Sequence, residues 1–310
     1  MKILVTGGAG YIGSILVPDL LADGHEVTVI DNFMYRQTSL NHVCIHQNFQ
    51  VVKGDIRVKE TMRSLIRNHD VIIPLAALVG APLCDRDPVG AQTINHDAVV
   101  MMLDLISPQQ WILMPTTNSA YGSGGEGNFC DETSPLRPLS KYAIDKVSIE
   151  KILMEHSNAI SFRLATVFGM SPRMRIDLLV NDFTYRAVND GFVVLFEAEF
   201  KRNYIHVRDV ASVFRHGIAS FPSMRGEIYN VGLSEANVTK RELCEEIKKC
   251  LPQFIFIEEK LKTDPDQRNY IVSNAKVEAT GYKPRYNLSN GIMELIKGYN
   301  MVNNRIFGNV

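Results

Sequence analysis

The chain has 310 residues, of which 45% are hydrophobic, so it can bury a full core as one main domain with a second, smaller lobe. Its 33 lysines and arginines nearly balance its 34 aspartates and glutamates, which excludes a broad basic field for nucleic acid or an anionic membrane. With no apolar segment typical of a signal peptide or a membrane span, we expect a soluble, cytoplasmic protein. The five cysteines form no CxxC pair, so we expect reduced thiols and no metal site.

The first half of the chain alternates short β-branched segments with helical patterns, which is typical of βαβ units and a parallel sheet. A helix pattern starts at Tyr11 and is capped by Gly24, and Asp87-Pro88 opens another that runs to about Ile106. The expected strands are 2–6, 26–31, 49–55, 70–76, 111–116 and 159–168.

Past Gly169 the regular alternation stops. The later segments predict helices near 175–190, 240–250 and 289–300 and a strand at 192–196. The fold class is therefore α/β, a doubly wound Rossmann sheet with a smaller, discontinuous C-terminal substrate lobe. We expect residues 1–168 to bind the nucleotide, with returning segments near 204–232, and residues 169–310 to form mainly the substrate lobe.

The glycines of GGAGYIGS follow the first strand and precede the first helix. Gly7 permits a tight turn, Gly10 lets the backbone approach a pyrophosphate, and Gly13 lets the helix pack on the strand. A phosphate can then lie at the N-terminus of the helix. This context predicts a dinucleotide site rather than a glycine turn that binds nothing.

Asp31 ends the second strand, where a carboxylate can accept hydrogen bonds from ribose hydroxyls and repel a 2′-phosphate. The expected cofactor is therefore NAD rather than NADP. Asp55-Ile56 can reach the adenine, and Leu75-Ala76-Ala77 offers a floor of mainly small residues beneath the dinucleotide. Taken alone, these last two segments are no stronger evidence for a nucleotide site than any other strand ends.

Tyr142 and Lys146 stand four residues apart in a segment with helical periodicity, so both project from one face. A phenol has a pKa of about 10, and a nearby ammonium can lower it by roughly one to three units. Alone, such a pair is as consistent with a solvated helix face as with a catalytic base. Its position after a hydroxyl-rich strand end favours the catalytic interpretation.

Thr117 lies at that strand end and can place a hydroxyl beside Tyr142, with Thr116 and Ser119 as competing hydroxyls. The mechanism expected is removal of a proton from a sugar hydroxyl by the phenolate of Tyr142 while Thr117 hydrogen-bonds that oxygen. Hydride passes from the same carbon to NAD, and Lys146 holds the nicotinamide ribose.

With these motifs in hand, the chain resembles the extended short-chain dehydrogenase/reductase family almost from end to end. The nucleotide-sugar branch of this family contains UDP-glucose 4-epimerase and the 4,6-dehydratases. The resemblance rests on GGAGYIGS, Asp55, LAA, TTNSAYG, the YxxxK pair and KRNYIHVRDV. It implies catalytic roles for Thr117, Tyr142 and Lys146, and a homodimer built through helices at about 88–106 and 138–156.

The resemblance also implies the residues of both binding sites. Arg202 and Arg268 match diphosphate-binding arginines, which suits bidentate guanidinium contacts. The cofactor-binding residues expected are Gly7, Gly10, Tyr11, Ile12, Gly13, Asp31, Asn32, Asp55, Ile56, Leu75, Ala76, Ala77, Asn95, Tyr142 and Lys146. The substrate-binding residues expected are Thr117, Asn118, Arg173, Arg202 and Arg268.

Two departures and one closer likeness refine the expectation. The 4,6-dehydratases follow their threonine with an Asp-Glu pair, whereas this chain has Asn118-Ser119, which argues against dehydration. Pro74 stands where the family often has a histidine. The segments LVGAPLCDRDP and SPRMRIDLLVNDFTYRA are similar to the GDP-heptose 4-dehydrogenases of capsule polysaccharide biosynthesis. The product expected is a 4-keto nucleotide heptose, with a UDP-sugar 4-epimerase as the alternative.

Three further interpretations stay open. Cys84 is either an acid for a 3,5-epimerisation or a small apolar loop residue, and the second interpretation is favoured. Arg173 and Arg175 fall in a loop that closes over the substrate in this family, where sugar contact and solvent exposure are equally consistent. A non-catalytic NAD-sensing protein is a remote alternative, because such relatives lack the tyrosine and lysine.

Overall fold

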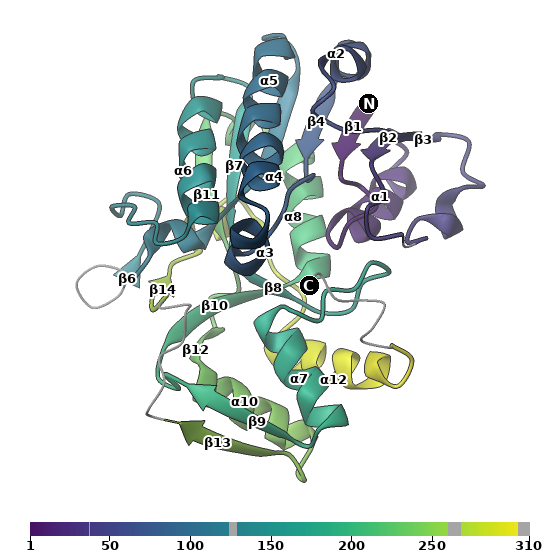
Figure 1. Cartoon of the computed structure of the whole chain (residues 1–310). Helices are drawn as coiled ribbons and strands as arrows, with labels where there is room; N and C mark the ends of the chain where they lie inside the picture. The colour runs from purple at the N-terminus through teal and green to yellow at the C-terminus, as the bar shows by residue number, and fades with distance from the viewer. Residues whose placement is uncertain (37, 124–128, 260–267, 303–310) are drawn as a thin grey trace.

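A seven-stranded parallel sheet forms the centre of the structure, a computed structural model that describes residues 1–36, 38–123, 129–259 and 268–302 (Figure 1). Its order is β11-β7-β5-β4-β1-β2-β3, with every neighbouring pair parallel. The strands are β1 (Lys2–Thr6), β2 (Glu26–Asp31), β3 (Phe49–Lys53), β4 (Val71–Pro74), β5 (Trp111–Thr117), β7 (Ala159–Leu164) and β11 (Glu227–Val231). The chain builds outward from β1 in one direction and then restarts at β4 on the other side, so a switch point lies between β1 and β4.

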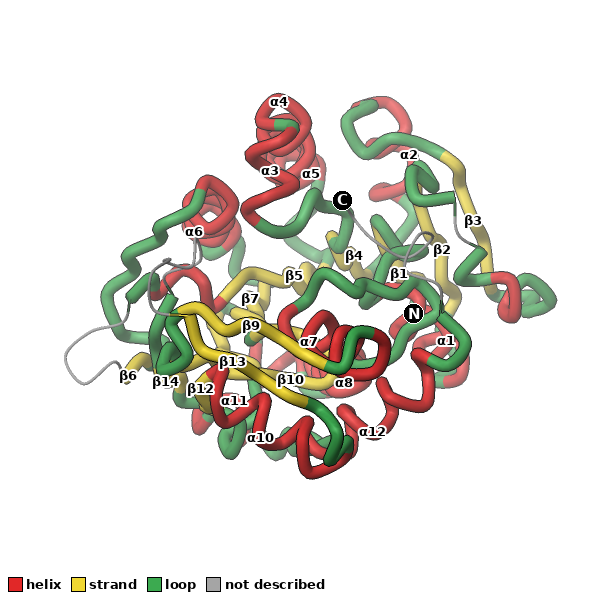
Figure 2. Tube along the Cα trace, turned by 60° about the horizontal axis from the view of Figure 1, so that its bottom comes forward, coloured by secondary structure: helices red, strands yellow, loops and turns green. Residues whose placement is uncertain are grey.

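Helices cover both faces of this sheet (Figure 2). One face carries α1 (Gly13–Ala22) and α8 (Val207–Ala219), which contact each other. The other face carries α2 (Lys59–Arg67), α5 (Ala98–Leu105) and α6 (Lys141–Leu153). The shorter helical segments are η1 (Asn41–Val43), α3 (Ala81–Arg86), α4 (Pro88–Ala91), the π-helical turn η2 (Gln92–Asp97), η3 (Asn118–Tyr121), α9 (Phe221–Met224) and α11 (Ala275–Glu278).

Alternating side chains of the strands explain the two covered faces. In β1, Ile3 and Val5 belong to the hydrophobic core beside α1 and α8, whereas Leu4 belongs to the core beside α2, α5 and α6. Successive strand residues point to opposite faces, and all three side chains are fully buried. A strand that is apolar on both faces is stable only between two helical layers. The apolar segments of the first half therefore determine a doubly wound sheet.

The second lobe lies beside the carboxyl edge of the sheet and is built from later segments (Figure 1). Its helices are α7 (Leu179–Asn189), α10 (Lys240–Cys250) and α12 (Leu288–Tyr299), which contact one another. Its strands form three small sheets: β8 (Thr166–Phe168), β10 (Lys201–His206) and β12 (Asn237–Thr239); β9 (Phe192–Phe196) and β13 (Ile255–Glu259); β6 (Phe129–Cys130) and β14 (Ile271–Val272).

The expected strand at 159–168 was wrong as one element. It divides into β7, which belongs to the large sheet, and β8, which pairs with β10 in the second lobe. Between them, the backbone N–H of Ala165 donates to the carbonyl oxygen of Val231 at 2.8 Å, so the chain is still held to β11 as it leaves the sheet. Apolar periodicity continues through the bend because both halves are buried, and the sequence pattern therefore did not reveal it.

Helix starts also differ from the sequence expectation. The first helix begins at Gly13 rather than Tyr11, and α7 begins at Leu179 rather than near residue 175. In the segment 204–232, β10 pairs with strands of the second lobe, whereas α8 packs on α1 and β11 pairs with β7 in the large sheet. The residues between Gly169 and α7 form a loop, and this loop borders the candidate site.

Candidate functional site

A cavity of about 970 Å³ lies at the carboxyl ends of the parallel strands. Its lining includes residues at or just after the ends of β1, β2, β3, β4 and β5, together with segments of the second lobe. This is the crevice where ligands bind in open parallel sheets, because helix N-termini and strand ends converge there. A cavity of this size can hold a dinucleotide and a second ligand.

The glycine loop forms the floor of one part of this cavity. Gly7 has a φ of 65°, and a Cβ added to it would lie 2.6 Å from the backbone of Ala76. A Cβ on Gly13 would lie 2.5 Å from the carbonyl oxygen of Gly8. Only glycine fits these two positions, so β1, α1 and the chain after β4 can approach closely. The residues at the start of α1, 10–13, line the cavity, and a helix N-terminus in this position suits a pyrophosphate.

Asp31 is held in place at the end of β2. Its carboxylate accepts hydrogen bonds from the backbone N–H groups of Ala9 at 3.0 Å and Phe33 at 2.8 Å. Burial raises the pKa of this carboxyl, and these two hydrogen bonds act in the opposite direction. The carboxylate is therefore fixed between the glycine loop and the chain after β2, where ribose hydroxyls can reach it.

The other expected cofactor residues line the same cavity, with one exception. Tyr11, Ile12, Asn32, Asp55, Ile56, Leu75, Ala76 and Ala77 all contribute to its wall. Asn95 does not. It lies buried on η2, where its side-chain amide donates to the carbonyl oxygen of Leu78 and accepts from the Leu78 backbone N–H, both at 2.8 Å. This position supports the chain after β4 from outside the cavity.

Tyr142 and Lys146 project into the cavity from α6. The helix starts here because the Ser140 side chain accepts from the backbone N–H of Ala143. Burial raises the pKa of the Tyr142 phenol to about 12, and the charge of Arg175 acts in the opposite direction. Burial also lowers the pKa of the Lys146 ammonium to about 8, and this ammonium donates to the carbonyl oxygen of Pro115 at 3.2 Å. The phenol becomes a base at neutral pH only with additional positive charge in the cavity.

The three candidate hydroxyls at the end of β5 differ in their partners. The Thr117 hydroxyl lines the cavity and accepts from the backbone N–H of Ser119 at 3.1 Å, so its own proton can be donated to a substrate oxygen. The Thr116 hydroxyl instead donates to Glu150 at 2.9 Å. The Ser119 hydroxyl accepts from Arg268. Among these hydroxyls, Thr117 is therefore best placed to orient a substrate alcohol.

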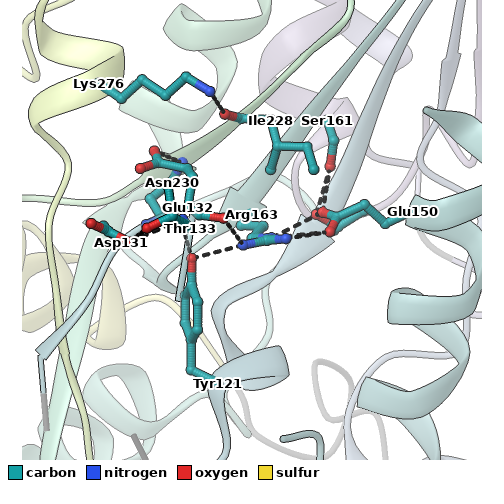
Figure 3. A network of polar contacts seen from close by, with 11 residues as sticks. Tyr121, Asp131, Glu132, Thr133, Glu150, Ser161, Arg163, Ile228, Asn230 and Lys276 are labelled. Atoms are coloured by element: carbon teal, nitrogen blue, oxygen red, sulfur yellow. Dashed lines mark hydrogen bonds and ion pairs between the residues drawn. The ribbon is translucent and has the colours of Figure 1, made fainter. Parts of the chain in front are cut away.

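A buried ionic network lies behind this wall (Figure 3). Arg163 on β7 donates to Glu150 at 2.6 Å and to the Tyr121 hydroxyl at 2.9 Å. The same carboxylate accepts from Ser161 at 2.8 Å. Glu150 stands four residues after Lys146 on α6, so the network fastens this helix, which carries Tyr142 and Lys146, to the sheet.

The cations that line the cavity besides Lys146 are Arg36, Lys141, Arg173, Arg175, Arg202, Lys240 and Arg268. Arg202 on β10 is buried, and Arg268 lies within charge range of Tyr142. Because the chain as a whole has balanced charge, a diphosphate has to be bound by local cations, and these two arginines can provide them. Asn118 is the expected substrate residue that does not line the cavity. It is buried on η3.

Sequence reasoning missed Lys240 and Tyr35, both of which line the cavity. Lys240 is the first residue of α10, where its ammonium donates to the carbonyl oxygen of Phe196 at 2.8 Å. A lysine at a helix start is usually a solvated residue, and no spacing in the sequence distinguishes this one. Cys84, by contrast, is buried outside the lining, and burial raises the pKa of its thiol. This environment opposes an acid role for the thiol, because a catalytic acid must reach the reacting atoms.

The described residues hold neither a metal-binding cluster nor a membrane-spanning helix. No group of three or more histidine, cysteine, aspartate or glutamate side chains in them is arranged to hold a metal ion. None of their helices has the length and apolar character required for a membrane span.

Comparisons with known proteins match this geometry. A family model described as "NAD dependent epimerase/dehydratase family" matches residues 3–232. The "Low-salt glycan biosynthesis protein Agl12" of Haloferax volcanii is 28% identical, with 96% of this chain and 98% of the relative covered. A "Putative UDP-glucose 4-epimerase" of Methanocaldococcus jannaschii is 25% identical over 95% of this chain and 97% of the relative. The Thermus thermophilus UDP-glucose 4-epimerase, solved in complex with NAD, has a TM-score of 0.83 and 26% identity over 97% of this chain and 99% of that chain.

Proposed function

The chain belongs to the NAD dependent epimerase/dehydratase family, and on this premise we propose that it oxidises carbon 4 of a nucleotide-diphosphate sugar with NAD. One observation carries the proposal: Thr117, Tyr142 and Lys146 line the same cavity as the glycine loop and the buried Arg202. One crevice therefore combines a side chain that can accept a proton, a loop that can bind a dinucleotide and an arginine that can bind a diphosphate.

Each residue has a chemical role in this proposal. Thr117 donates a hydrogen bond to the sugar oxygen, and the phenolate of Tyr142 takes the proton from that oxygen. Lys146 lowers the cost of the phenolate through its positive charge. NAD supplies the hydride acceptor when bound. Arg202 and Arg268 hold the diphosphate, so binding energy remote from carbon 4 positions the reacting atoms.

For the outcome of the reaction we propose release of a 4-keto nucleotide heptose, with GDP-heptose as substrate. Support comes from the likeness of SPRMRIDLLVNDFTYRA and LVGAPLCDRDP to the GDP-heptose 4-dehydrogenases. The residues of the second segment lie near the base: Leu78, Cys84 and Tyr142 pack in one apolar cluster. Asn118-Ser119, in place of the Asp-Glu pair of the dehydratases, argues against elimination of water after oxidation.

A UDP-sugar 4-epimerase is the second candidate. It is favoured by the likeness of the whole chain to the UDP-glucose 4-epimerases of Thermus thermophilus and Methanocaldococcus jannaschii. An epimerase uses the same proton and hydride transfers but returns hydride to the opposite face of the 4-keto sugar. The two candidates therefore differ in product and not in the residues that begin the reaction.

The products distinguish these outcomes. The protein is incubated in turn with GDP-heptose, UDP-glucose and UDP-N-acetylglucosamine, with an external oxidant present, and the products are followed by proton NMR. We expect a ketone or its hydrate from the GDP sugar and none with Tyr142→Phe, which removes the base and keeps the dinucleotide site. A clean 4-epimer from a UDP sugar, without net NADH, would assign the second candidate instead.

A further inference from the structure

Arg173 points toward the cofactor part of the cavity, although it lies in the loop expected to close over the sugar. Its guanidinium carbon lies 3.8 Å from the centre of the Tyr35 ring. Tyr35 belongs to the chain after β2, three residues beyond Asn32. Both side chains line the cavity, yet Arg173 is only 2% exposed. The contact therefore joins the second lobe to the adenosine end of the nucleotide site.

The backbone on both sides of this contact is fixed. On the Tyr35 side, the backbone N–H of Arg36 donates to the carbonyl oxygen of Phe33 at 2.9 Å and closes a turn around the tyrosine. Phe33 and Arg36 each have a φ of 54°, a left-handed conformation that is uncommon outside glycine. On the opposite side, the Tyr11 hydroxyl donates to the carbonyl oxygen of Gly169 at 2.7 Å. The Ser171 hydroxyl donates to the carbonyl oxygen of Tyr11 at 2.7 Å. The loop that carries Arg173 is thus fastened to the glycine loop itself.

The next arginine of the same loop, Arg175, has a different partner, Asp177, with which it forms an ion pair, and its charge also acts on the Tyr142 phenol. The charge of Arg173 acts instead on the Asp31 carboxyl. The charge of Arg175 also acts on Tyr35, but it is Arg173 that stacks on the Tyr35 ring. The two arginines, two residues apart, therefore provide a matched pair for mutation.

We infer that Arg173 and Tyr35 form a clasp that retains NAD. The start of α1 offers backbone N–H groups to the diphosphate of the dinucleotide. The desolvated guanidinium of Arg173, near Asp31, adds a positive charge to them. Stacking on Tyr35 holds the guanidinium plane in place, because a cation over an aromatic ring is attracted most strongly when water is excluded. The clasp closes the cofactor part of the cavity from the side of the second lobe, so NAD has to displace it to leave.

Retention affects how the enzyme turns over. An enzyme that keeps its dinucleotide has to regenerate NAD in place, either by returning hydride to the sugar or by passing it to a second bound oxidant. The clasp thus assigns Arg173 to the cofactor and leaves Arg202 and Arg268 for the sugar nucleotide.

The experiment measures cofactor release without any sugar. Wild type, Arg173→Ala, Arg173→Lys, Tyr35→Ala and Tyr35→Phe are purified, loaded with NADH and passed through a desalting column. Bound dinucleotide per chain is quantified, and the release rate is followed by NADH fluorescence after dilution into excess NAD. Circular dichroism checks the fold of each variant. Arg175→Ala is the matched control, and Arg186→Ala tests an exposed arginine on α7.

We expect Arg173→Ala and Tyr35→Ala each to release NADH faster by about ten-fold. Tyr35→Phe should have a smaller effect, because it keeps the ring under the guanidinium and loses only the hydroxyl that hydrogen-bonds to Arg173. The NADH release rate of Arg173→Lys should lie between those of wild type and Arg173→Ala, because an ammonium keeps the charge but lacks the planar guanidinium. The double alanine variant should release no faster than either single variant, because both remove one contact. The clasp would be overturned if Arg173→Ala released NADH at the wild-type rate. It would also be overturned if this variant bound GDP and UDP more weakly while still retaining NADH. No result here depends on which sugar is oxidised.

Discussion

At the scale of single residues, Lys146 illustrates a conflict between function and stability. Its side chain is buried, and burial lowers the pKa of its ammonium to about 8, against about 10.4 in an unfolded chain. At pH 7 the cofactor-free fold therefore holds a cation in an environment that disfavours it. Between these two pKa values the unfolded chain binds a proton that the folded chain has released, so stability rises with pH.

Lys146→Met should therefore stabilise the cofactor-free protein while abolishing turnover. We expect the free energy of unfolding to increase at pH 7 on the order of 1–3 kcal/mol, and the difference from wild type to shrink toward about pH 10. Urea unfolding at the two pH values measures this. A methionine variant that is less stable than wild type at pH 7 would show that the ammonium is stabilised by its surroundings.

The sequence predicted the residues that a short motif contains. Tyr142 and Lys146 are four residues apart on one helix, so their spacing places them on the same face. The three glycines occupy positions of one short loop where the backbone passes close to its neighbours, so their spacing in the sequence is also sufficient to identify them. Arg173 shows the limit of this reasoning. The loop was expected at the sugar, but the direction of the side chain depends on Tyr35, which is far away in sequence and part of no motif.

At the scale of elements, α6 is the helix on which the proposed chemistry depends. Tyr142 and Lys146 face the cavity, and Glu150 on the next turn forms the buried ion pair with Arg163 (Figure 3). Removing one partner from such a pair leaves an uncompensated charge. The network thus links the orientation of α6 to β7.

We expect Arg163→Met to destabilise the fold by about 3–5 kcal/mol, and the Glu150→Gln/Arg163→Met double variant to be less destabilised than this single variant. The control is Arg63→Ala, which removes an exposed pair with Glu60 and should cost about 1 kcal/mol or less. Urea unfolding compares the variants. Equal costs for Arg163→Met and Arg63→Ala would contradict a structural role for the network.

Boundaries of elements were predicted less well than their order. The sequence predicted the first five strands in their order along the chain, because short β-branched segments alternate there with helical patterns. It did not separate β7 from β8, since the bend at Ala165 is fixed by a hydrogen bond to β11, a strand formed some sixty residues later. Long-range pairing of this kind leaves no local pattern.

At the scale of the whole molecule, the helices expected at a dimer interface carry apolar side chains on the surface of the single chain. Val89 on α4 is 72% exposed, and Ile144 on α6 is 48% exposed. We propose a homodimer through α4, α5 and α6. Light scattering should give a dimer for wild type and a monomer for Val89→Glu/Ile144→Glu. Ile45→Glu, at an exposed site on the chain before β3, should remain a dimer. A wild-type monomer at micromolar concentration would refute the proposal.

The proposed reaction breaks the bond to hydrogen at carbon 4 of the sugar. Protein loaded with NAD is mixed in a stopped-flow instrument with GDP-heptose or UDP-glucose that carries either hydrogen or deuterium at carbon 4, and absorbance at 340 nm is recorded during the first turnover. Deuterium slows a step that breaks this bond. We expect reduced cofactor to form with one of these sugars, more slowly from the deuterated form, and not at all in Tyr142→Phe. Formation at the same rate from both isotopic forms, together with deuterium retained at carbon 4 in the product, would contradict the proposed reaction.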